Sequence, residues 1–266
     1  MKNQEKKDLM KDIIEYSKEL RFPAIRKYLT DETEYARKEN LSYEQFLHGL
    51  LQKEYDMRVE NGKLNRIRIA AFPAKKYLED LKVEELPQDA QRKLNILKTL
   101  DFVKNGQNVI LAGPPGTGKT HISIGLGIKA ALEGYRVFFT TVPLLINQLK
   151  EARGASTLRS FELRFEKYDL VIADELGYIS FDKEGSELLF TNLSLRAGRK
   201  STIITTNLSF ERWDEIFLDP VITAAMIDRL THKSYMVNMN GSSYRMKETK
   251  EWLAKHKELD EGGDKN

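Results

Sequence analysis

One short stretch, AGPPGTGKTH at positions 112–121, contains the residue types that bind phosphate. Gly113, Gly118, Lys119 and Thr120 satisfy the pattern G-x-x-x-x-G-K-[ST], with an apolar run before it and a helical pattern after it. Glycines let successive backbone N–H groups face phosphates, and the lysine and hydroxyl can reach the β- and γ-phosphates and Mg²⁺. The flanking strand and helix disfavour an ordinary Gly-Pro turn. The residues expected to bind the nucleotide are Gly113, Pro114, Pro115, Gly116, Thr117, Gly118, Lys119, Thr120 and His121.

Two carboxylates, Asp174 and Glu175, follow the apolar run 170–173. The carboxyl ends of parallel strands face the ligand crevice, so we expect Asp174, together with Thr120, to hold Mg²⁺ and Glu175 to orient or deprotonate an attacking water. Acids after a strand often only cap the next helix, but the upstream loop favours the catalytic interpretation. An Asp-Glu pair favours water as the nucleophile, whereas a small-molecule kinase excludes water and needs a second substrate pocket. The sequence therefore indicates hydrolysis of the bound nucleotide.

Two further polar residues come later in the chain. Asn207 follows the strand pattern 202–206, where its amide can reach the γ-phosphate or the lytic water; a turn residue before the next helix is the alternative. Arg229 lies near the end of a helical pattern that precedes the last strand. Taken alone, such an arginine is most often a solvated surface residue.

Apolar runs alternating with helical stretches must position these side chains. The runs are 108–112, 136–140, 170–173, 202–206 and 235–239. This rhythm predicts an α/β fold, with a five-stranded parallel sheet and helices on both of its faces. The connection between Val142 and Tyr168 is long enough for two helices, with Gly154 as a stop signal between them.

The residues before the sheet have helical periodicity and no strand pattern. Ser42 and Gln45 form a capping-box pattern that opens a third helix, and the Phe72-Pro73 pair marks a boundary. We expect a helical domain at 1–72 for oligomerisation or partner contact, an ATPase domain at 73–256, and a disordered acidic tail at 257–266.

Composition sets outer limits. With 266 residues, the chain has room for one or two domains, and its net charge of +3 requires any nucleic-acid contact to rest on local patches. The absence of cysteine excludes disulfides and thiolate metal sites. The first residues lack the apolar core of a signal peptide, and no apolar run is long enough to span a membrane, so we expect a cytoplasmic protein without a membrane partner.

The motif order resembles that of the AAA+ ATPases: Walker A loop, Walker B acids, sensor 1 and arginine finger. The two-helix insertion resembles that of the DnaA/DnaC initiator clade. More narrowly, AGPPGTGKTH, VIADELGYIS, IITTNLSFERW and RIAAFPAKKYLEDL are similar to the IstB family, the ATPase helpers of insertion-sequence transposition. The resemblance covers nearly the whole chain. Too few residues follow the last strand for a full helical lid, which leaves open whether Arg245 replaces the usual sensor 2 arginine.

The resemblance implies an ATPase that uses ATP and Mg²⁺ as an assembly switch. It implies a homo-oligomer with ATP sites at subunit interfaces, in which Arg229 of one subunit completes the site of its neighbour. The implied partners are duplex DNA, bound largely without sequence preference, and a cognate transposase served in target selection and strand transfer. A DnaC-like helicase loader, which binds a replicative helicase through its N-terminal helices, is the alternative.

Two basic clusters are candidates for DNA contacts: Lys150, Arg153, Arg159 and Arg164 in the insertion, and Lys63, Arg66 and Arg68 before the boundary. In an assembly, several positive charges per subunit neutralise phosphates additively. Taken alone, the first cluster with its interleaved acidic residues is more typical of a solvated helix face than of a DNA contact. Arg66 and Arg68 lie on different sides of a helix, so only part of the second cluster faces one partner. With no base-reading motif, we expect little sequence specificity.

Overall fold

The computed structural model describes residues 2–261, with side chains described from residue 7 to residue 254. By contacts, the chain divides into two compact units, Met1–Asn65 and Arg66–Asn266. The division falls before the boundary expected at Phe72, because the stretch 66–72 packs on the second unit. The two units are described separately below.

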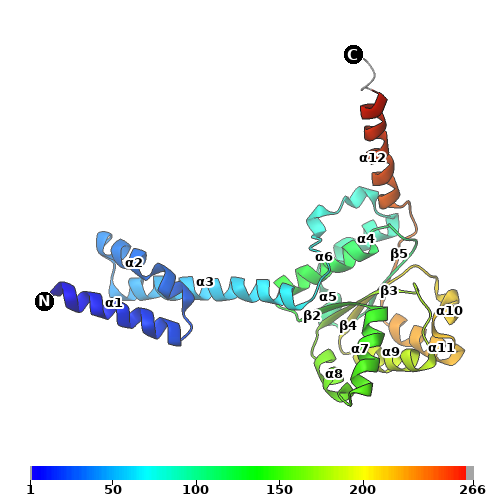
Figure 1. The fold of residues 1–266 in the computed structure, drawn as a ribbon, viewed down its shortest axis with the longest axis horizontal. Helices are drawn as coiled ribbons and strands as arrows, with labels where there is room; N and C mark the ends of the chain where they lie inside the picture. Colours follow the sequence, from blue (N-terminus) through cyan, green and yellow to red (C-terminus); the bar gives the residue numbers. More distant parts are fainter. Residues whose placement is uncertain (1, 262–266) are drawn as a thin grey trace. The chain divides into compact units, whose positions relative to one another are not determined.

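The first unit is helical. It contains α1 (Lys2–Glu19), α2 (Pro23–Lys38) and most of α3 (Tyr43–Ile69) (Figure 1). The predicted capping box is confirmed at the start of α3: Gln45 N donates to Ser42 Oγ at 3.2 Å, and Ser42 N donates to Gln45 Oε1 at 2.8 Å. Two N–H groups that the first turn of a helix leaves unpaired are thereby satisfied.

A buried carboxylate joins α2 to α3. Glu54, only 4% exposed, accepts hydrogen bonds from the backbone N–H groups of Ala24 at 2.8 Å and Ile25 at 3.3 Å. These N–H groups belong to the first turn of α2, which offers no side-chain cap of its own. Arg58 Nε donates to the other Glu54 oxygen at 3.0 Å, so the buried charge is compensated. Glu54 therefore serves as a charged cap supplied from another helix.

The second unit is an α/β domain. Its elements are η1 (Leu78–Asp80), η2 (Val83–Glu85), α4 (Gln88–Leu97), α5 (Asp101–Lys104), β1 (Val109–Ala112), α6 (Lys119–Leu132), β2 (Val137–Thr141), α7 (Val142–Gly154), α8 (Leu158–Phe165), β3 (Leu170–Leu176), α9 (Lys183–Arg196), β4 (Ser201–Thr206), η3 (Phe210–Arg212), α10 (Asp214–Phe217), α11 (Pro220–Thr231), β5 (Tyr235–Asn238) and α12 (Tyr244–Glu261). The strands pair in parallel in the order β2-β3-β4-β1-β5. The predicted five-stranded sheet and two-helix insertion are confirmed.

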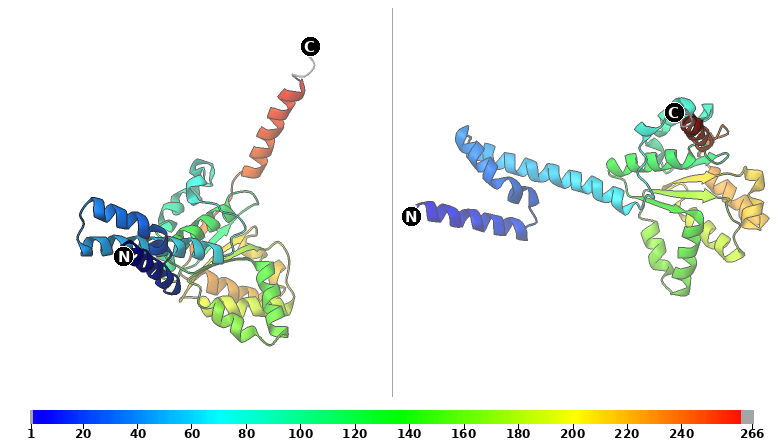
Figure 2. Two further views of the ribbon diagram at one scale, coloured as in Figure 1. Left: turned by 60° about the vertical axis from the view of Figure 1, so that its left-hand side comes forward. Right: turned by 45° about the horizontal axis from the view of Figure 1, so that its top comes forward.

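Both faces of the sheet are covered by helices. Alternate residues of each strand enter different clusters: Val109 and Leu111 face the layer of α4 and α6, while Ile110 faces the layer of α7, α9 and α11. Figures 1 and 2 show the sheet between these two layers. Because both faces are buried, the strands read as continuous apolar runs rather than as alternating ones.

Buried polar side chains tie the amino ends of the central strands. Asn108 Oδ1 accepts a hydrogen bond from Thr202 N at 3.0 Å, which joins the start of β1 to β4. Arg196, 1% exposed, donates to the carbonyl oxygens of Phe165 and Ser201, each at 2.9 Å. Burial lowers the pKa of Arg196 to about 10, so the side chain is still charged at neutral pH.

A carboxylate lies at the same edge. Asp169 accepts hydrogen bonds from Lys200 Nζ and from Arg136 N at 2.9 Å. Burial by itself would raise the pKa of Asp169, but these hydrogen bonds outweigh burial and hold that pKa below its ordinary value. The starts of β2, β3 and β4 are therefore linked by charge as well as by packing.

The last helix reaches further than expected. α12 runs to Glu261 and so includes 257–261, the first half of the segment we expected to be disordered. Strong helix formers such as Ala254, Lys257 and Glu258 continue there, with Gly262 and Gly263 only after them. The rest of that segment, 262–266, lies outside the described residues. Across the described part of the chain, no helix combines the length and apolar content needed to cross a membrane.

Candidate functional site

The Gly-rich loop joins β1 to α6, as the motif predicts. Gly116 and Gly118 have φ values of 81° and 94°, which residues with a side chain rarely adopt. Gly113 is required for a different reason, since a Cβ atom there would lie 2.5 Å from the carbonyl carbon of Met239 after β5. The glycines of the motif therefore satisfy both backbone conformation and close packing, and the loop wraps around the N-terminus of α6.

Lys119 lies inside the loop. Its side chain is 7% exposed, and its Nζ donates to the carbonyl oxygens of Gly113 at 2.6 Å and Pro114 at 2.8 Å. Burial lowers the pKa of Lys119; the charge of Asp174 opposes this shift and the charge of Arg245 adds to it. A phosphate at the loop would place negative charge beside this ammonium group and favour its charged form.

Asp174 meets the hydroxyls of two threonines. It is 3% exposed and accepts from Thr120 Oγ1 at 3.1 and 3.2 Å and from Thr205 Oγ1. A hydroxyl beside a carboxylate is an oxygen pair that suits Mg²⁺, which keeps several waters and takes phosphate oxygens as further ligands. Among the described residues no group of three or more His, Cys, Asp or Glu side chains could hold a metal ion. The residues present therefore fit Mg²⁺ bound together with a nucleotide, and do not fit a metal held by the protein alone.

A β-bulge turns Glu175 toward solvent. The register of β3 against β4 shifts between Ala173 and Leu176, and Glu175 has a φ of 66°. Its N–H donates to Thr205 Oγ1 at 3.0 Å. Bulges beside active sites commonly re-aim a side chain. Here the bulge leaves Asp174 buried while Glu175 is exposed and lines the adjoining pocket.

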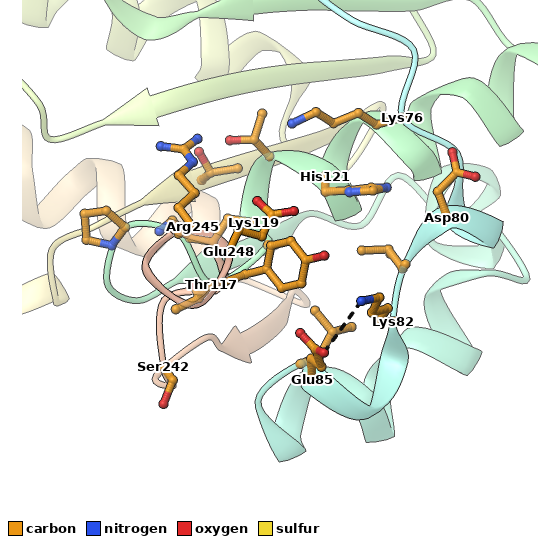
Figure 3. A pocket seen from close by; sticks show the side chains of 18 of the residues that line it. Lys76, Asp80, Lys82, Glu85, Thr117, Lys119, His121, Ser242, Arg245 and Glu248 are labelled. Carbon is orange, nitrogen blue, oxygen red and sulfur yellow. Dashed lines mark ion pairs between the residues drawn. The ribbon is translucent and has the colours of Figure 1, made fainter. Parts of the chain in front are cut away.

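The pocket beside the loop has a volume of about 420 Å³, within the range of small-molecule sites. Besides Thr205, Tyr178, Glu175 and loop residues 115–121, its lining comes from two segments at opposite ends of the domain sequence: Lys76, Asp80, Leu81, Lys82, Glu85 and Leu86, and Ser242, Tyr244, Arg245 and Glu248. Figure 3 shows side chains of both segments around the pocket. The pocket thus includes Arg245, whose role the sequence left open.

Sequence reasoning missed Thr205 and, apart from Arg245, the pocket residues of these outer segments. The hydroxyl of Thr205 carried no distinct signal, because four of the six residues of β4 are Ser or Thr. Glu85 and Lys247 carried no local signal, because their 2.8 Å ion pair joins residues far apart in the chain. Each residue is ordinary in its own neighbourhood, and only the fold brings them together.

Asn207 and Arg229 lie outside this pocket. Asn207 lines a neighbouring pocket of about 380 Å³, and its buried Oδ1 has no hydrogen-bond partner among the described residues. Arg229 is exposed on α11, with its guanidinium 6.0 Å from the centre of the Phe190 ring. Within one chain the structure therefore brings together the loop, Thr120, Asp174 and Glu175, places Asn207 beside Gly113 and Pro114 on the other side of the loop, and leaves Arg229 apart.

The candidate DNA-binding residues of the insertion are largely engaged in ion pairs. Lys150 Nζ contacts the two Asp182 oxygens at 2.6 and 2.7 Å. Arg153 pairs with Glu184 at 3.5 Å. On α8, Arg159 pairs with Glu162 at 3.4 Å, whereas Arg164 is exposed with its guanidinium 5.8 Å from the Phe161 ring centre.

The three residues of the second basic cluster, Lys63, Arg66 and Arg68, differ in their contacts. Arg66 Nε donates to the carbonyl oxygen of Ala131 in the last turn of α6 at 2.7 Å, which is a structural contact. Lys63 pairs with Glu60 at 3.2 Å, and Arg68 is exposed. A cation that satisfies a helix C-terminus cannot move to a phosphate without loss of that contact.

Comparison with known protein sequences finds relatives over most of the chain. The profile of a family described as IstB-like ATP binding protein matches residues 16–252. A protein of Geobacillus stearothermophilus, named as an ATP-binding protein of insertion sequence IS5376, is 34% identical over 249 residues, which are 94% of this chain and 98% of that protein. The corresponding protein of insertion sequence IS21 from Pseudomonas aeruginosa is 38% identical over 215 residues, 81% of each chain.

Solved structures support the fold. The replication initiator DnaA, bound to AMPPCP and single-stranded DNA, matches with a TM-score of 0.54 and 20% identity, over 70% of this chain and 56% of that one. The DnaC helicase loader matches with a TM-score of 0.50 and 21% identity, over 62% of this chain and 99% of that one. At these identities the likeness concerns the fold alone. Together with the strand order, it confirms the predicted AAA+ P-loop fold.

Proposed function

Because the chain belongs to the family of IstB-like ATP-binding proteins, we propose that it hydrolyses ATP and uses the nucleotide cycle to control its assembly on duplex DNA, where it assists a transposase in target selection and strand transfer. The observation that carries the proposal is the end of β3. There a buried Asp174 contacts Thr120 of the phosphate loop, while the next residue, Glu175, is turned into the pocket. A carboxylate that lines the pocket beside the phosphate loop is placed to accept a proton from an attacking water.

Different side chains of the pocket have separate roles in the proposed hydrolysis. Loop N–H groups and Lys119 bind the β- and γ-phosphates, and Thr120 with Asp174 would hold Mg²⁺, which when bound neutralises charge on the phosphate oxygens. Glu175 accepts a proton from a water as that water attacks the γ-phosphorus; the bond to the bridging oxygen breaks, and ADP leaves with its electron pair. Inorganic phosphate is the second product.

We propose that Arg229 acts on a neighbouring subunit. The side chain is exposed and is not among the residues that line the pocket of its own chain. An arginine supplied from another subunit stabilises the charge of a phosphoryl-transfer transition state. In this arrangement the ATP site is complete only in an oligomer, so assembly and hydrolysis are linked.

The proposed DNA contacts differ in what they would cost the fold. Arg159 and Arg164 lie on the exposed surface of α8, and phosphate could compete with the single ion pair of Arg159. Lys150, Arg153 and Lys63 would exchange carboxylate partners for phosphates. Arg66 would give up its contact with α6. We therefore place the first DNA contacts at α8.

The test uses Glu175→Gln, which keeps the size of the side chain and removes the base. We expect turnover, measured as phosphate release, to fall by about 100-fold or more, because general-base catalysis contributes at least that much. ATP-dependent binding to duplex DNA, measured by fluorescence anisotropy, should remain. Glu248→Gln is the matched control, since it removes another exposed carboxylate from the same pocket.

Two results would contradict the proposal. The first is turnover by Glu175→Gln at the wild-type rate. The second is wild-type binding to duplex DNA that is indifferent to ATP. Preference for single strands, together with capture of a replicative helicase rather than a transposase, would instead identify a helicase loader.

A further inference from the structure

A segment before the sheet lies along α6. This segment, residues 66–86, is called the strap below. At its start Arg66 Nε donates to the Ala131 carbonyl oxygen at 2.7 Å, in the last turn of α6. Further along, the Phe72 ring lies so close to Gly127 that a Cβ atom there would be 2.8 Å from it. The strap thus runs from the C-terminal end of α6 toward the phosphate loop.

The strap continues to the N-terminal end of α6. Leu78, 5% exposed, lies over Gly125, where a Cβ atom would be 2.6 Å from its Cδ2. The carbonyl oxygen of Tyr77 lies 2.8 Å from Nε2 of His121, which directly follows the Mg²⁺-binding candidate Thr120. Each turn of α6 is therefore in contact with the strap.

The two glycines inside α6 are required by space rather than by backbone conformation. Gly125 and Gly127 lie in the interior of the helix, and neither is among the residues with positive φ. A glycine in a helix interior is less favourable than alanine. At Gly125 the nearest atoms that a Cβ would meet all belong to Leu78. The helix thus accepts a local cost at the position where Leu78 packs.

The far end of the strap forms part of the nucleotide pocket. Lys76, Lys82 and Glu85 line it. Glu85 also pairs with Lys247 of α12 at 2.8 Å. A bound nucleotide would therefore restrain the strap directly, through charges that face the pocket.

We propose that the strap couples the nucleotide pocket to the last turn of α3, and that Leu78, packed on Gly125, is the positioning residue that holds the strap on α6. This inference rests on the proposed function only in requiring that ATP binds at the loop. The triphosphate adds negative charge next to Lys76 and Lys82 and orders that end of the strap. The contacts along α6 extend the restraint to Arg66, which lies in the last turn of α3. Coupling is reciprocal, so a partner that restrains α3 strengthens ATP binding by the same factor.

The experiment is amide hydrogen exchange on the full chain, with and without a non-hydrolysable ATP analogue and Mg²⁺. In the wild type we expect the analogue to slow exchange at the loop, 113–121, and also at 66–71, which does not line the pocket, by about fivefold or more. Gly125→Ala crowds Leu78 without touching the pocket. It should keep the slowing at the loop and lose it at 66–71.

Two further variants complete the design. Leu78→Ala removes the same contact from the strap side without crowding α6, and it should also abolish the effect at 66–71, even if Gly125→Ala fails to fold. Gly154→Ala is the matched control, because a Cβ atom there meets nothing within 4 Å. It should behave as the wild type.

The outcomes separate this inference from the proposed function. Slowing at the loop without slowing at 66–71 in the wild type would overturn the strap's role, and so would persistence of the 66–71 effect in both Gly125→Ala and Leu78→Ala. If the analogue failed to slow exchange even at the loop of the wild type, the nucleotide site itself would be wrong, and the coupling with it.

Discussion

Replacing Thr205 with valine tests whether the bulge in β3 positions Glu175. The Thr205 hydroxyl, in a residue 1% exposed, donates to Asp174 and accepts from Glu175 N at 3.0 Å. Valine has nearly the same shape and removes both hydrogen bonds. A hydrogen bond to a charged group contributes about 1.5–3 kcal/mol and a neutral one about 1 kcal/mol, so their loss sums to roughly 3 kcal/mol.

That free energy is lost at the residues expected to perform the chemistry. A displacement of about 1 Å in a catalytic group can cost about 100-fold in rate. We therefore expect Thr205→Val to lower kcat by about 10- to 100-fold, while KM for ATP changes less because the loop and Lys119 still bind the phosphates. The assays are phosphate release over a range of ATP concentrations and urea unfolding of the same protein.

Thr205→Ser is the control, since it keeps the hydroxyl and loses only a methyl group. It should retain kcat within about threefold of the wild type. The reasoning is refuted if Thr205→Val is less stable but turns over ATP as fast as the serine variant, because the hydroxyl would then support the fold without positioning Glu175.

Three further outcomes are expected. Arg229→Ala and Lys119→Ala should each be inactive alone. In an equal mixture, about a quarter of the interfaces should combine an intact Lys119 from one subunit with an intact Arg229 from the next and so recover turnover, if sites are shared between subunits. An inactive mixture would argue against that role for Arg229. Asp169→Asn should lower the free energy of unfolding by about 1 kcal/mol at pH 7, because the pKa of Asp169 is lower in the folded than in the unfolded protein. The ionised carboxylate therefore stabilises the fold at pH values above about 3.9, the ordinary pKa of Asp, and this stabilisation is lost as the pH falls through the folded-state pKa. Urea unfolding at pH 7 and pH 3 should show the difference shrinking in acid, and a constant difference would contradict it. Glu54→Gln should lower stability by about 1 kcal/mol in urea unfolding followed by circular dichroism, since the cap of α2 loses its charge; unchanged stability would exclude a contribution from that charge.

The sheet and the loop were predictable because their signals are local. Short apolar runs such as 108–112, which is followed by the Gly-rich loop, predict buried parallel strands without knowledge of any partner. The structure confirms these strands to within a few residues. β3 ran beyond the predicted Ala173, because the bulge keeps Asp174 and Glu175 in the strand while changing their direction.

The outer wall of the pocket was not predictable in the same way. Nothing in the sequence around Glu85 or Lys247 indicates that they meet. The same limit applied to Lys150, whose Asp182 partner lies in the turn before α9 and satisfies a charge that appeared available to DNA. Periodicity and motif spacing describe one segment at a time, whereas these contacts depend on which segments the fold brings together.

The ties at the amino ends of the strands have an evolutionary consequence. Asn108, Arg196 and Asp169 stabilise one edge of the sheet, and the nucleotide residues occupy the opposite edge. Substitutions that alter the nucleotide site at the carboxyl edge will mostly be destabilising, as mutations generally are. Compensating substitutions can accumulate at the amino edge without contact with ATP. Lineages of this protein can therefore vary the residues around the nucleotide while retaining a domain that folds, and directed evolution would do well to vary both edges together.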